Sequence, residues 1–274
     1  MACGGNYKGE KMKVAVIIST YNWPEALNLC LASLAQQNHK PDEVIIGDDG
    51  SRADTKEVID RWRSKLTIYH EWQEDSGFRL ARSRNLTLRK VTAEYVICID
   101  GDMVLHPDFV SDHLSFAKKG SFVQGSRVLL NDDFSKQIMS SSQPWRWNTK
   151  LIEGGVLGNR NNLIRKPLLT RLIGLQAKES AKNTRTCNMA FWREDLYAVN
   201  GFDNRYEGWG REDSDLAWRL VNYGVKRRKL KFSAVALHIY HPEVSRASLP
   251  ENDKMLQRVL DDKSYYRCES GIEE

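Results

Sequence analysis

Short apolar runs alternate with amphipathic stretches along the first hundred residues. Four runs are apolar and rich in β-branched residues, which is typical of strands buried on both faces of a sheet: 14–18, 44–46, 66–70 and 95–99. The stretches between them place apolar residues three or four positions apart, a helical spacing. This alternation predicts βαβ units and therefore an α/β fold, with helices on both faces of a mostly parallel sheet.

The helices between these runs carry recognisable start signals. Asn22 is expected to cap the first helix, because Pro24 suits a first turn and the apolar face follows at once. A second helix is predicted around Val58–Trp62 and a third over residues 80–90, where Leu80, Arg84 and Leu88 lie four apart.

The alternation loosens beyond about residue 125. Residues 186–192 and 235–237 predict two further strands, and 213–222 predict a helix that Gly224 ends. Residues 131–150 combine Asn, Asp and Ser with Trp145 and Trp147, and they predict a long loop that orders when substrate binds. The charged last thirty residues predict a helical tail.

Composition narrows the class of protein. The chain has 274 residues, of which 41% are hydrophobic and 28% charged, as expected for a globular protein of one large domain or of two closely joined lobes. No run approaches the ~20 apolar residues that cross a bilayer, and no basic and apolar leader precedes Val14. Five scattered cysteines without a CxxC pair argue against a disulfide framework and favour a cytoplasmic protein.

The charge balance is mildly basic. A net charge of +5 fits contact with phosphates or with an anionic membrane surface, whereas no motif for nucleic-acid binding is present. The densest basic cluster is Lys226–Lys229. It is interpreted either as a solvated helix exit or as a membrane or phosphate contact.

Polar clusters follow three of the predicted strands: Ser19–Asn22, Asp48–Ser51 and Asp100–Asp102. In parallel sheets, ligands bind beyond the carboxyl ends of the strands. Asp100 and Asp102 would repel each other unless a cation lies between them, so we expect a divalent metal there, although DxD also occurs in solvated turns. Asp48 can accept from the imide N–H of a uracil, and an ordinary Asp-Gly turn remains the alternative.

A second group of candidate residues lies in the C-terminal half. Glycines flank Trp209 and leave its indole free to stack on a sugar. Glu212 and Asp213 open a helix, where they either complement the helix dipole or supply a general base, and Glu207 adds a nearby carboxylate. His238 and His241 lie around a strand end, and one of them is a candidate metal ligand.

Taken in order, these motifs resemble the inverting family 2 glycosyltransferases of the GT-A fold. The resemblance rests on Ser19–Asn22, Asp48–Ser51, Arg84-Asn85 and Asp100–Asp102, followed by a galactosyltransferase-type segment from Asn188 to Asp213 that bacterial chondroitin-polymerase-like enzymes share. It covers about residues 12–245. It implies a flexible leader (1–11), a nucleotide-sugar half (12–125), an acceptor and catalytic half of the same domain (126–245) and a tail (246–274).

The resemblance also implies roles for single residues. Asp213 is the expected base, and Asp102 with His241 the expected ligands of Mn²⁺ or Mg²⁺, with His238 as the competing histidine. The resemblance assigns acceptor binding to Trp209, Glu207 and Glu212. It assigns nucleotide binding to Thr20, Tyr21, Asn22, Asp48, Arg79, Arg84, Asn85 and Asp100. The chain departs from the family at Arg211, where a glycine is common.

The implied reaction moves a sugar from a UDP-sugar to a glycan hydroxyl in bacterial surface polysaccharide or lipopolysaccharide synthesis. Lipid-linked glycans are among the candidate acceptors, and the cytoplasmic face of the inner membrane is a candidate location. Three other hypotheses remain open: a nucleotidyltransferase, although its Gly-rich phosphate loop is absent after Ile18; a glycosidase; and a non-catalytic sugar-binding module.

Overall fold

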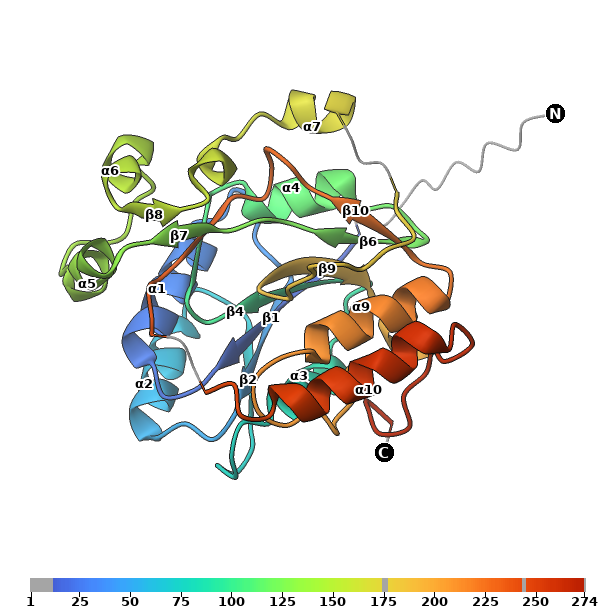
Figure 1. Cartoon of the computed structure of the whole chain (residues 1–274). Coiled ribbons are helices and arrows are strands. Elements are labelled where there is room, and N and C mark those ends of the chain that lie inside the picture. Colours follow the sequence, from blue (N-terminus) through green and yellow to red (C-terminus); the bar gives the residue numbers. More distant parts are fainter. Residues whose placement is uncertain (1–11, 174–176, 243–244, 274) are drawn as a thin grey trace.

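The computed structural model describes residues 12–173, 177–242 and 245–273, so the predicted leader 1–11 lies outside the described residues. A seven-stranded sheet runs through the molecule in the order β10-β6-β9-β4-β1-β2-β3 (Figure 1). Its strands are β1 (Val14–Thr20), β2 (Glu43–Asp48), β3 (Ile68–Trp72), β4 (Tyr95–Asp100), β6 (Ser121–Gln124), β9 (Asn188–Trp192) and β10 (Lys226–Lys229). All its pairings are parallel except those of β9, which runs antiparallel to β4 and β6.

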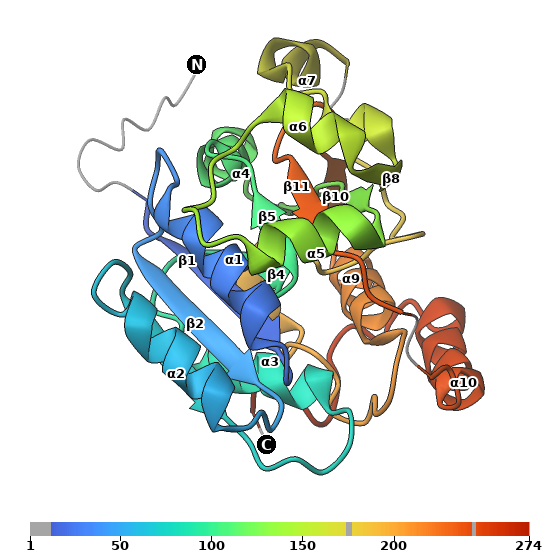
Figure 2. The same ribbon diagram turned by 90° about the vertical axis from the view of Figure 1, so that its left-hand side faces the viewer.

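Both faces of the sheet are buried, as the continuous apolar runs predict. In β1, Val14, Val16 and Ile18 belong to one apolar cluster, whereas Ala15 and Ile17 belong to another on the opposite face. The first face is covered by α1 (Pro24–Ala35), α2 (Ala53–Trp62) and α4 (Phe109–Phe116). The second is covered by α3 (Leu80–Lys90), α8 (Arg193–Ala198) and α9 (Glu212–Asn222), so the predicted α/β architecture is confirmed (Figure 2).

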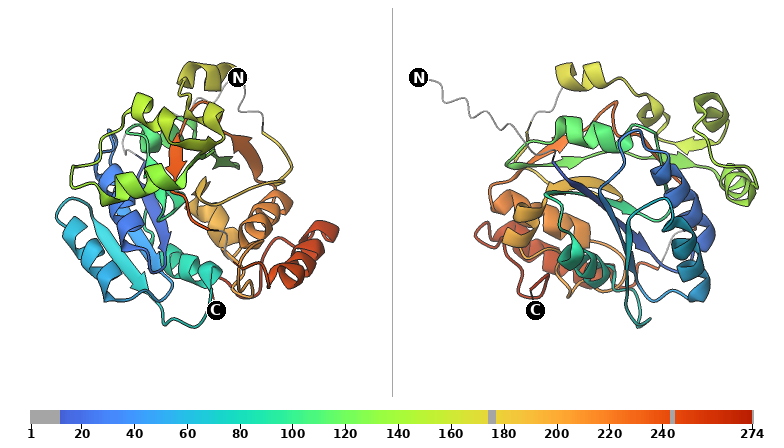
Figure 3. Two further views of the ribbon diagram at one scale, coloured as in Figure 1. Left: turned by 60° about the vertical axis from the view of Figure 1, so that its left-hand side comes forward. Right: turned by 180° about the vertical axis from the view of Figure 1, so that it is seen from behind.

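A second, four-stranded sheet forms a smaller lobe beside the first (Figure 3). Its order is β5-β11-β7-β8, with β5 (Met103–Leu105), β11 (Ala236–His238), β7 (Val128–Leu130) and β8 (Val156–Gly158). Short helices accompany it: α5 (Asp132–Ser140), α6 (Thr149–Gly154), the 3₁₀ turn η1 (Arg160–Leu163) and α7 (Pro167–Ile173). The lobe begins directly after β4 and returns at β11, so it meets the large sheet where the DxD motif ends β4.

The C-terminal part of the chain packs onto the body. Helix α10 (Leu249–Asp261), within the predicted tail, lies along α9 (Figure 1). The residues after α10 turn back, and Cys268 and Ile272 are buried. The backbone N–H of Ile272 donates to the carbonyl of Asn200 at 3.0 Å, so this segment is tied to the loop before α9.

The structure corrects the predicted loop over residues 131–150. Helix α5 occupies 132–140, because the Asn131 side chain accepts from the Phe134 N–H at 2.8 Å and Phe134 and Ile138 bury the same helical face. The Trp147 ring packs edge-on against His106, with the two ring centres 4.8 Å apart. Within the predicted loop, Asn131 and residues 141–148 lie outside any helix or strand.

Two further local predictions are wrong. Lys226–Lys229 is not a helix exit but the edge strand β10, which pairs in parallel with β6. Asn22 does not cap α1, because Trp23 holds that position; Asn22 has a φ of 45°, and its side chain accepts from the Arg52 N–H at 3.0 Å.

Two predictions from composition agree with the structure. Cys30, Cys98, Cys187 and Cys268 are buried free thiols, and Cys3 lies outside the described residues. Within the described ranges, no helix combines the length and the apolar character that a bilayer crossing requires.

Candidate active site

The three predicted polar clusters lie side by side at one edge of the large sheet. In the parallel register, Thr20 of β1 is opposite Asp48 of β2, and Ser19 is opposite Asp100 of β4. Gly101 N–H donates to the Ser19 carbonyl at 2.8 Å, which holds the DxD turn against β1. The carboxyl ends of β1, β2 and β4 therefore form one polar edge, as expected for a ligand site of a parallel sheet.

Asp102 lies in the turn between β4 and β5 and faces two histidines. Its Oδ2 atom is 3.3 Å from Nε2 of His238 and 3.5 Å from Nε2 of His241. One ligand atom from each of the three side chains lies within 4.8 Å of the others. The pairing of β11 with β5 makes this possible, because it places His238 opposite Met103, the residue after Asp102.

The chemistry of this cluster fits a divalent cation. Burial, and next the neighbouring Asp100 carboxylate, raise the pKa of Asp102 to about 8, while burial lowers the pKa of His238 to about 3. The Oδ1 atom of Asp102 is buried and has no hydrogen-bond partner among the described residues. One carboxylate and two imidazoles with an unsatisfied buried oxygen form a donor set suited to Mn²⁺ and similar ions.

Arg84 lies at the centre of the site. Its side chain is 4% exposed, and it donates to Asp100 Oδ1 at 3.0 Å, to Glu212 Oε1 at 3.1 Å and to the Ser19 hydroxyl at 3.1 Å. The guanidinium also packs over the Phe202 ring at 5.2 Å. One side chain from α3 thus joins β1, β4 and the start of α9.

The acidic pair Glu212 and Asp213 begins α9. Glu212 is buried, and burial together with the neighbouring Asp213 raises its pKa to about 7. Burial also raises the pKa of Asp213, although Arg84 opposes this, and Asp213 remains half-exposed. A carboxylate with a raised pKa that solvent or substrate can reach is suited to accept a proton near neutral pH.

The turn before α9 is unusual in its backbone. Gly208 and Gly210 have φ values of 71° and 104°, and Arg211 also adopts a left-handed conformation with φ of 82°. A Cβ on Gly208 would lie 2.1 Å from the Ser248 hydroxyl, so the residue must be glycine. Arg211 thus takes the backbone conformation that glycine favours, which is a physical reason for a glycine at this position and gives none for the arginine found here.

Asp48 and Asp49 are each held in part by a residue that the sequence motifs do not identify. Asp48 is 1% exposed; its Oδ2 is 2.9 Å from Nε2 of His70, and its Oδ1 accepts from the Ser51 N–H at 2.8 Å. Asp49 accepts from the Gln73 amide and, at 2.8 Å, from the Arg79 N–H. His70 and Gln73 come from β3 and the residue after it, and only the strand pairing brings them here.

The other predicted nucleotide residues lie in different surroundings. Thr20 is buried at the end of β1, whereas Tyr21 is half-exposed and its hydroxyl donates to Asp75 at 3.0 Å. The Arg79 guanidinium donates to the Glu74 carbonyl. Asn85 is fully buried and exchanges hydrogen bonds with the backbone of Phe202, so it does not face the polar edge that holds Asp48.

The predicted acceptor residues lie in the loop before α9 and at the first residue of that helix. Trp209 is half-exposed, with the Arg246 guanidinium 5.2 Å from its ring centre, and Glu207 is exposed. The Asn252 side chain of α10 donates to the carbonyls of Glu207 and Gly210 at 3.2 and 2.9 Å. Helix α10 thus fixes the loop that presents Trp209.

Comparison with known proteins identifies the family of this chain. The model of glycosyl transferase family 2 matches residues 15–183, which is more than half of the chain. The chain belongs to glycosyltransferase family 2. A second model, described as the N-terminal domain of galactosyltransferase, matches residues 171–242 of this family 2 protein.

Curated relatives and solved structures agree with the family. The chain is 27% identical to a chondroitin synthase of Escherichia coli, covering 82% of this chain and 34% of the relative. It is 27% identical to a hyaluronan synthase of Pasteurella multocida, covering 77% of this chain and 23% of the relative. The chain therefore spans about a third or less of these relatives.

Among solved structures, S. aureus TarS residues 1–349 in complex with UDP has a TM-score of 0.63 at 18% identity, covering 92% of this chain and 65% of that one. A mannosyltransferase from Pyrobaculum calidifontis in complex with GDP-Man and Mn²⁺ has a TM-score of 0.61 at 18% identity, with coverage of 92% and 65%. The protein thus has the GT-A fold and belongs to a family that transfers glycosyl groups.

Proposed function

We propose that this protein is a metal-dependent inverting glycosyltransferase that moves a hexosyl or N-acetylhexosaminyl group from a UDP-sugar to a glycan hydroxyl. One observation carries the proposal: Arg84 bonds to both Asp100 and Glu212. The carboxylates assigned to the donor and those assigned to the acceptor thereby form one continuous polar group. The UDP and UDP-GlcNAc complexes of TarS support a uridine nucleotide as the donor.

The proposed metal ligands are Asp102, His241 and also His238. The two histidines lie at similar distances from Asp102, so the geometry favours both rather than a choice between them. A bound Mn²⁺ or Mg²⁺ would supply positive charge for the diphosphate of the donor. The Mn²⁺ complex of the mannosyltransferase supports this assignment.

Asp213 is the proposed base. Its half-exposed position in the first turn of α9 lets it accept the proton of the acceptor hydroxyl as that oxygen attacks the anomeric carbon. Arg84 stabilises the anionic form of the Glu212–Asp213 pair, because it donates directly to Glu212. A single displacement of this kind inverts the configuration at the sugar and needs no covalent intermediate.

The polar edge beside β1 and β2 is the proposed nucleotide site. Each carboxylate oxygen has two lone pairs, so Asp48 can accept from a uracil imide while His70 and Ser51 keep it in place. Thr20, Tyr21 and Asn22 follow β1 at the same edge, and Arg79 lies beside Asp49. Asn85 supports the site indirectly, by holding the turn at Phe202 that packs against Arg84.

Trp209, Glu207 and Glu212 are the proposed acceptor residues. An indole face stacks well on the apolar face of a sugar, and Trp209 is accessible on one side. The names of the curated relatives, chondroitin and hyaluronan synthases, support a polysaccharide acceptor. We infer a role in bacterial surface polysaccharide or lipopolysaccharide synthesis at the cytoplasmic face of the membrane.

Product analysis tests this proposal against the other hypotheses. UDP-sugars are incubated with the protein, Mn²⁺ and a panel of glycans, and the released compounds are identified by mass spectrometry. Release of UDP that depends on a glycan supports glycosyl transfer, and a β-linked product from an α-linked donor supports inversion. Release of pyrophosphate from a sugar phosphate and a nucleoside triphosphate would instead identify a nucleotidyltransferase.

A further inference from the structure

The lobe formed by α6, β8, η1 and α7 exposes an unusual amount of aliphatic surface. In the part of the chain that the structure describes, six Leu and Ile side chains are highly exposed, and five of them fall within 22 residues: Leu151, Leu157, Ile164, Leu168 and Leu172. Single exposed leucines are common in soluble proteins, but several exposed leucines in one segment indicate a surface that binds a protein, a membrane or a ligand.

Helix α7 presents two of these side chains outward because its other face is anchored. Thr170 is 2% exposed and donates to the Lys231 carbonyl at 2.6 Å, and the Lys166 N–H donates to the Phe232 carbonyl at 2.8 Å. Leu168 and Leu172 lie four residues apart and therefore share one helix face. They are 74% and 81% exposed, more than any other large apolar side chain in the described ranges.

Positive charge surrounds these leucines. Residues 146–173 contain six Lys and Arg and one Glu, a net charge of +5 that equals the net charge of the whole chain. Arg165 pairs with Asp108 and Asp112, whereas the other five basic side chains are exposed. We define the α7 face as Ile164, Lys166, Leu168, Arg171, Leu172 and Lys231; Lys231 is exposed and its carbonyl contacts Thr170.

We propose that the α7 face docks this protein onto an anionic lipid bilayer. Lysine is depleted in protein–protein interfaces, so exposed leucines flanked by Lys166 and Lys231 match a bilayer better than a protein partner. The leucines would enter the headgroup boundary while the cations meet lipid phosphates. Helix α7 projects at the periphery, beyond α4 and β7, so a flat membrane can reach it (Figure 1).

The docking face is structurally connected to the candidate metal site. The small sheet carries β5 and β11 at one side, next to Asp102 and His238, and β8 at the other. Helix α7 follows β8 and is anchored to the loop that leads into β11. Docking through α7 would therefore hold the site at a defined height above the bilayer, whichever reaction the site performs.

Vesicle flotation with the full chain tests the proposal. Vesicles of phosphatidylcholine alone are compared with vesicles that also contain phosphatidylglycerol, at low and high salt. We expect the wild type to float only with the anionic vesicles and to be released by salt. The double variants Leu168→Ser/Leu172→Ser and Lys166→Glu/Arg171→Glu should each lower the partition coefficient roughly tenfold or more.

A matched variant on α10, Leu260→Ser/Lys254→Glu, removes the same residue types from a helix elsewhere on the molecule and should float like the wild type. Circular dichroism and sugar transfer to a soluble acceptor should be unchanged in the α7 variants. Failure of the wild type to bind anionic vesicles would overturn the proposal, as would equal binding by the α7 variants. A dimer in light scattering that Leu168→Ser/Leu172→Ser dissolves, without vesicle binding, would assign the face to a second copy.

Discussion

Two imidazoles lie close enough to Asp102 to share one cation with it, and this distinguishes the site from a pair of carboxylates alone. Nitrogen ligands bind late first-row metals more tightly than oxygen ligands do, and they bind Mg²⁺ poorly. We therefore expect the site to prefer Mn²⁺, Co²⁺ or Zn²⁺ over Mg²⁺. Oδ1 of Asp102, a buried oxygen without a hydrogen-bond partner among the described residues, is available for the same ion or its water.

Replacing either histidine should weaken metal binding. His238→Ala and His241→Ala are each expected to lower Mn²⁺ affinity by about tenfold or more, since even a lost partner of a metal ligand costs about 10–100-fold. Electron paramagnetic resonance titration of Mn²⁺ measures the effect without any turnover. His106→Ala removes a histidine outside the cluster and is the control; a full effect for only one of the two histidines would restrict the site to that residue.

The acidic pair at the start of α9 should set the pH dependence of transfer. The pKa of Glu212 is raised to about 7, and burial also raises the pKa of Asp213, so the pair loses its protons at a higher pH than free carboxyl groups do. The base acts only when ionised, and kcat/KM should therefore rise with pH up to about neutrality. A rate profile that stays flat down to pH ~5 would contradict this role.

The raised pKa of Glu212 also makes the stability of the folded chain depend on pH. The folded chain keeps a proton on Glu212 that the unfolded chain releases near pH 4.5, the ordinary value. The contribution of Glu212 to stability is therefore full below that pH and declines as pH rises towards about 7. Sequence motifs located this pair, but not its pKa, which depends on burial against α3.

At the scale of single elements, the turn into α9 depends on three residues with positive φ. A left-handed conformation costs an L-residue about 1–2 kcal/mol, which Gly208 and Gly210 avoid and Arg211 does not. The ion pair of Arg211 with Asp253 is half-exposed and compensates by about 0–1 kcal/mol at most.

Substitutions at Arg211 test this explanation. Arg211→Gly should leave the free energy of unfolding unchanged or raise it by about 0.5 kcal/mol, whereas Arg211→Val should lower it by about 1–2 kcal/mol. Asp253→Ala is the control that removes the ion pair alone. Chemical denaturation measures all three, and equal stability of the Gly and Val variants would show that no strain is present.

Helices and strands could be predicted from the sequence where their own residues determine the secondary structure. The buried strands β1, β2 and β4 followed from continuous apolar runs. Strand β10 did not, because Lys226–Lys229 has no strand pattern and becomes a strand only by pairing with β6. Helix α5 had a local signal, the Asn131 cap and the Phe134–Ile138 spacing, but the surrounding Ser and Asp residues are equally typical of loops.

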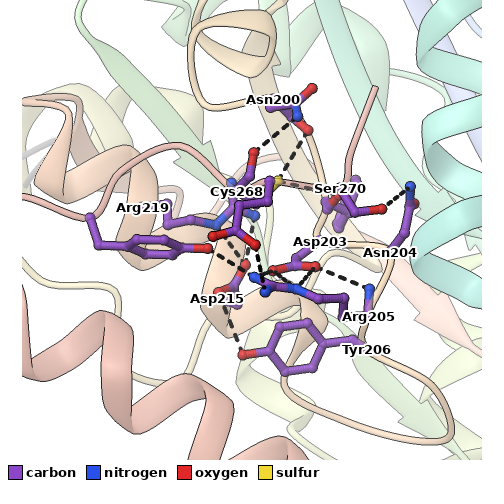
Figure 4. Close-up of polar contacts among 12 residues, drawn as sticks. Asn200, Asp203, Asn204, Arg205, Tyr206, Asp215, Arg219, Cys268 and Ser270 are labelled. Carbon is purple, nitrogen blue, oxygen red and sulfur yellow. Dashed lines mark hydrogen bonds and ion pairs between the residues drawn. The ribbon is translucent and has the colours of Figure 1, made fainter. Parts of the chain in front are cut away.

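At the scale of the whole molecule, the C-terminal segment and α9 are locked together by a buried polar network (Figure 4). Arg219 is fully buried; it pairs with Asp215 at 2.6 Å and donates to the carbonyls of Val199 and Gly201. The side chain of Asn200 donates to the Cys268 carbonyl at 3.0 Å. The network ties the loop that precedes the turn into α9 to the end of the chain.

Breaking this network should destabilise the whole fold. Arg219→Met leaves the Asp215 carboxylate buried without its partner and should lower the free energy of unfolding by about 3–5 kcal/mol. The double variant Arg219→Met/Asp215→Leu removes both charges and should recover part of the loss. Denaturant unfolding measures both, and a double variant no more stable than the single one would contradict the assignment of the loss to an unpaired charge.

The sequence motifs could not predict long-range packing of this kind. The order of the motifs was enough to predict the sheet edge that gathers Asp48 and Asp100. It could not show that His70 holds Asp48, that Arg84 lies between two carboxylates, or that residues after α10 return to the body. Each of these contacts joins residues from separate elements and depends on how the elements pack.

The central claim is that Asp213 accepts the proton of the acceptor hydroxyl. The most direct test compares Asp213→Asn with the wild type in glycan-dependent UDP release, while calorimetry measures UDP binding in the presence of Mn²⁺. We expect a loss of kcat of about 10²–10⁴-fold in the variant, with UDP affinity unchanged. Turnover of the variant within a few fold of the wild type would contradict it.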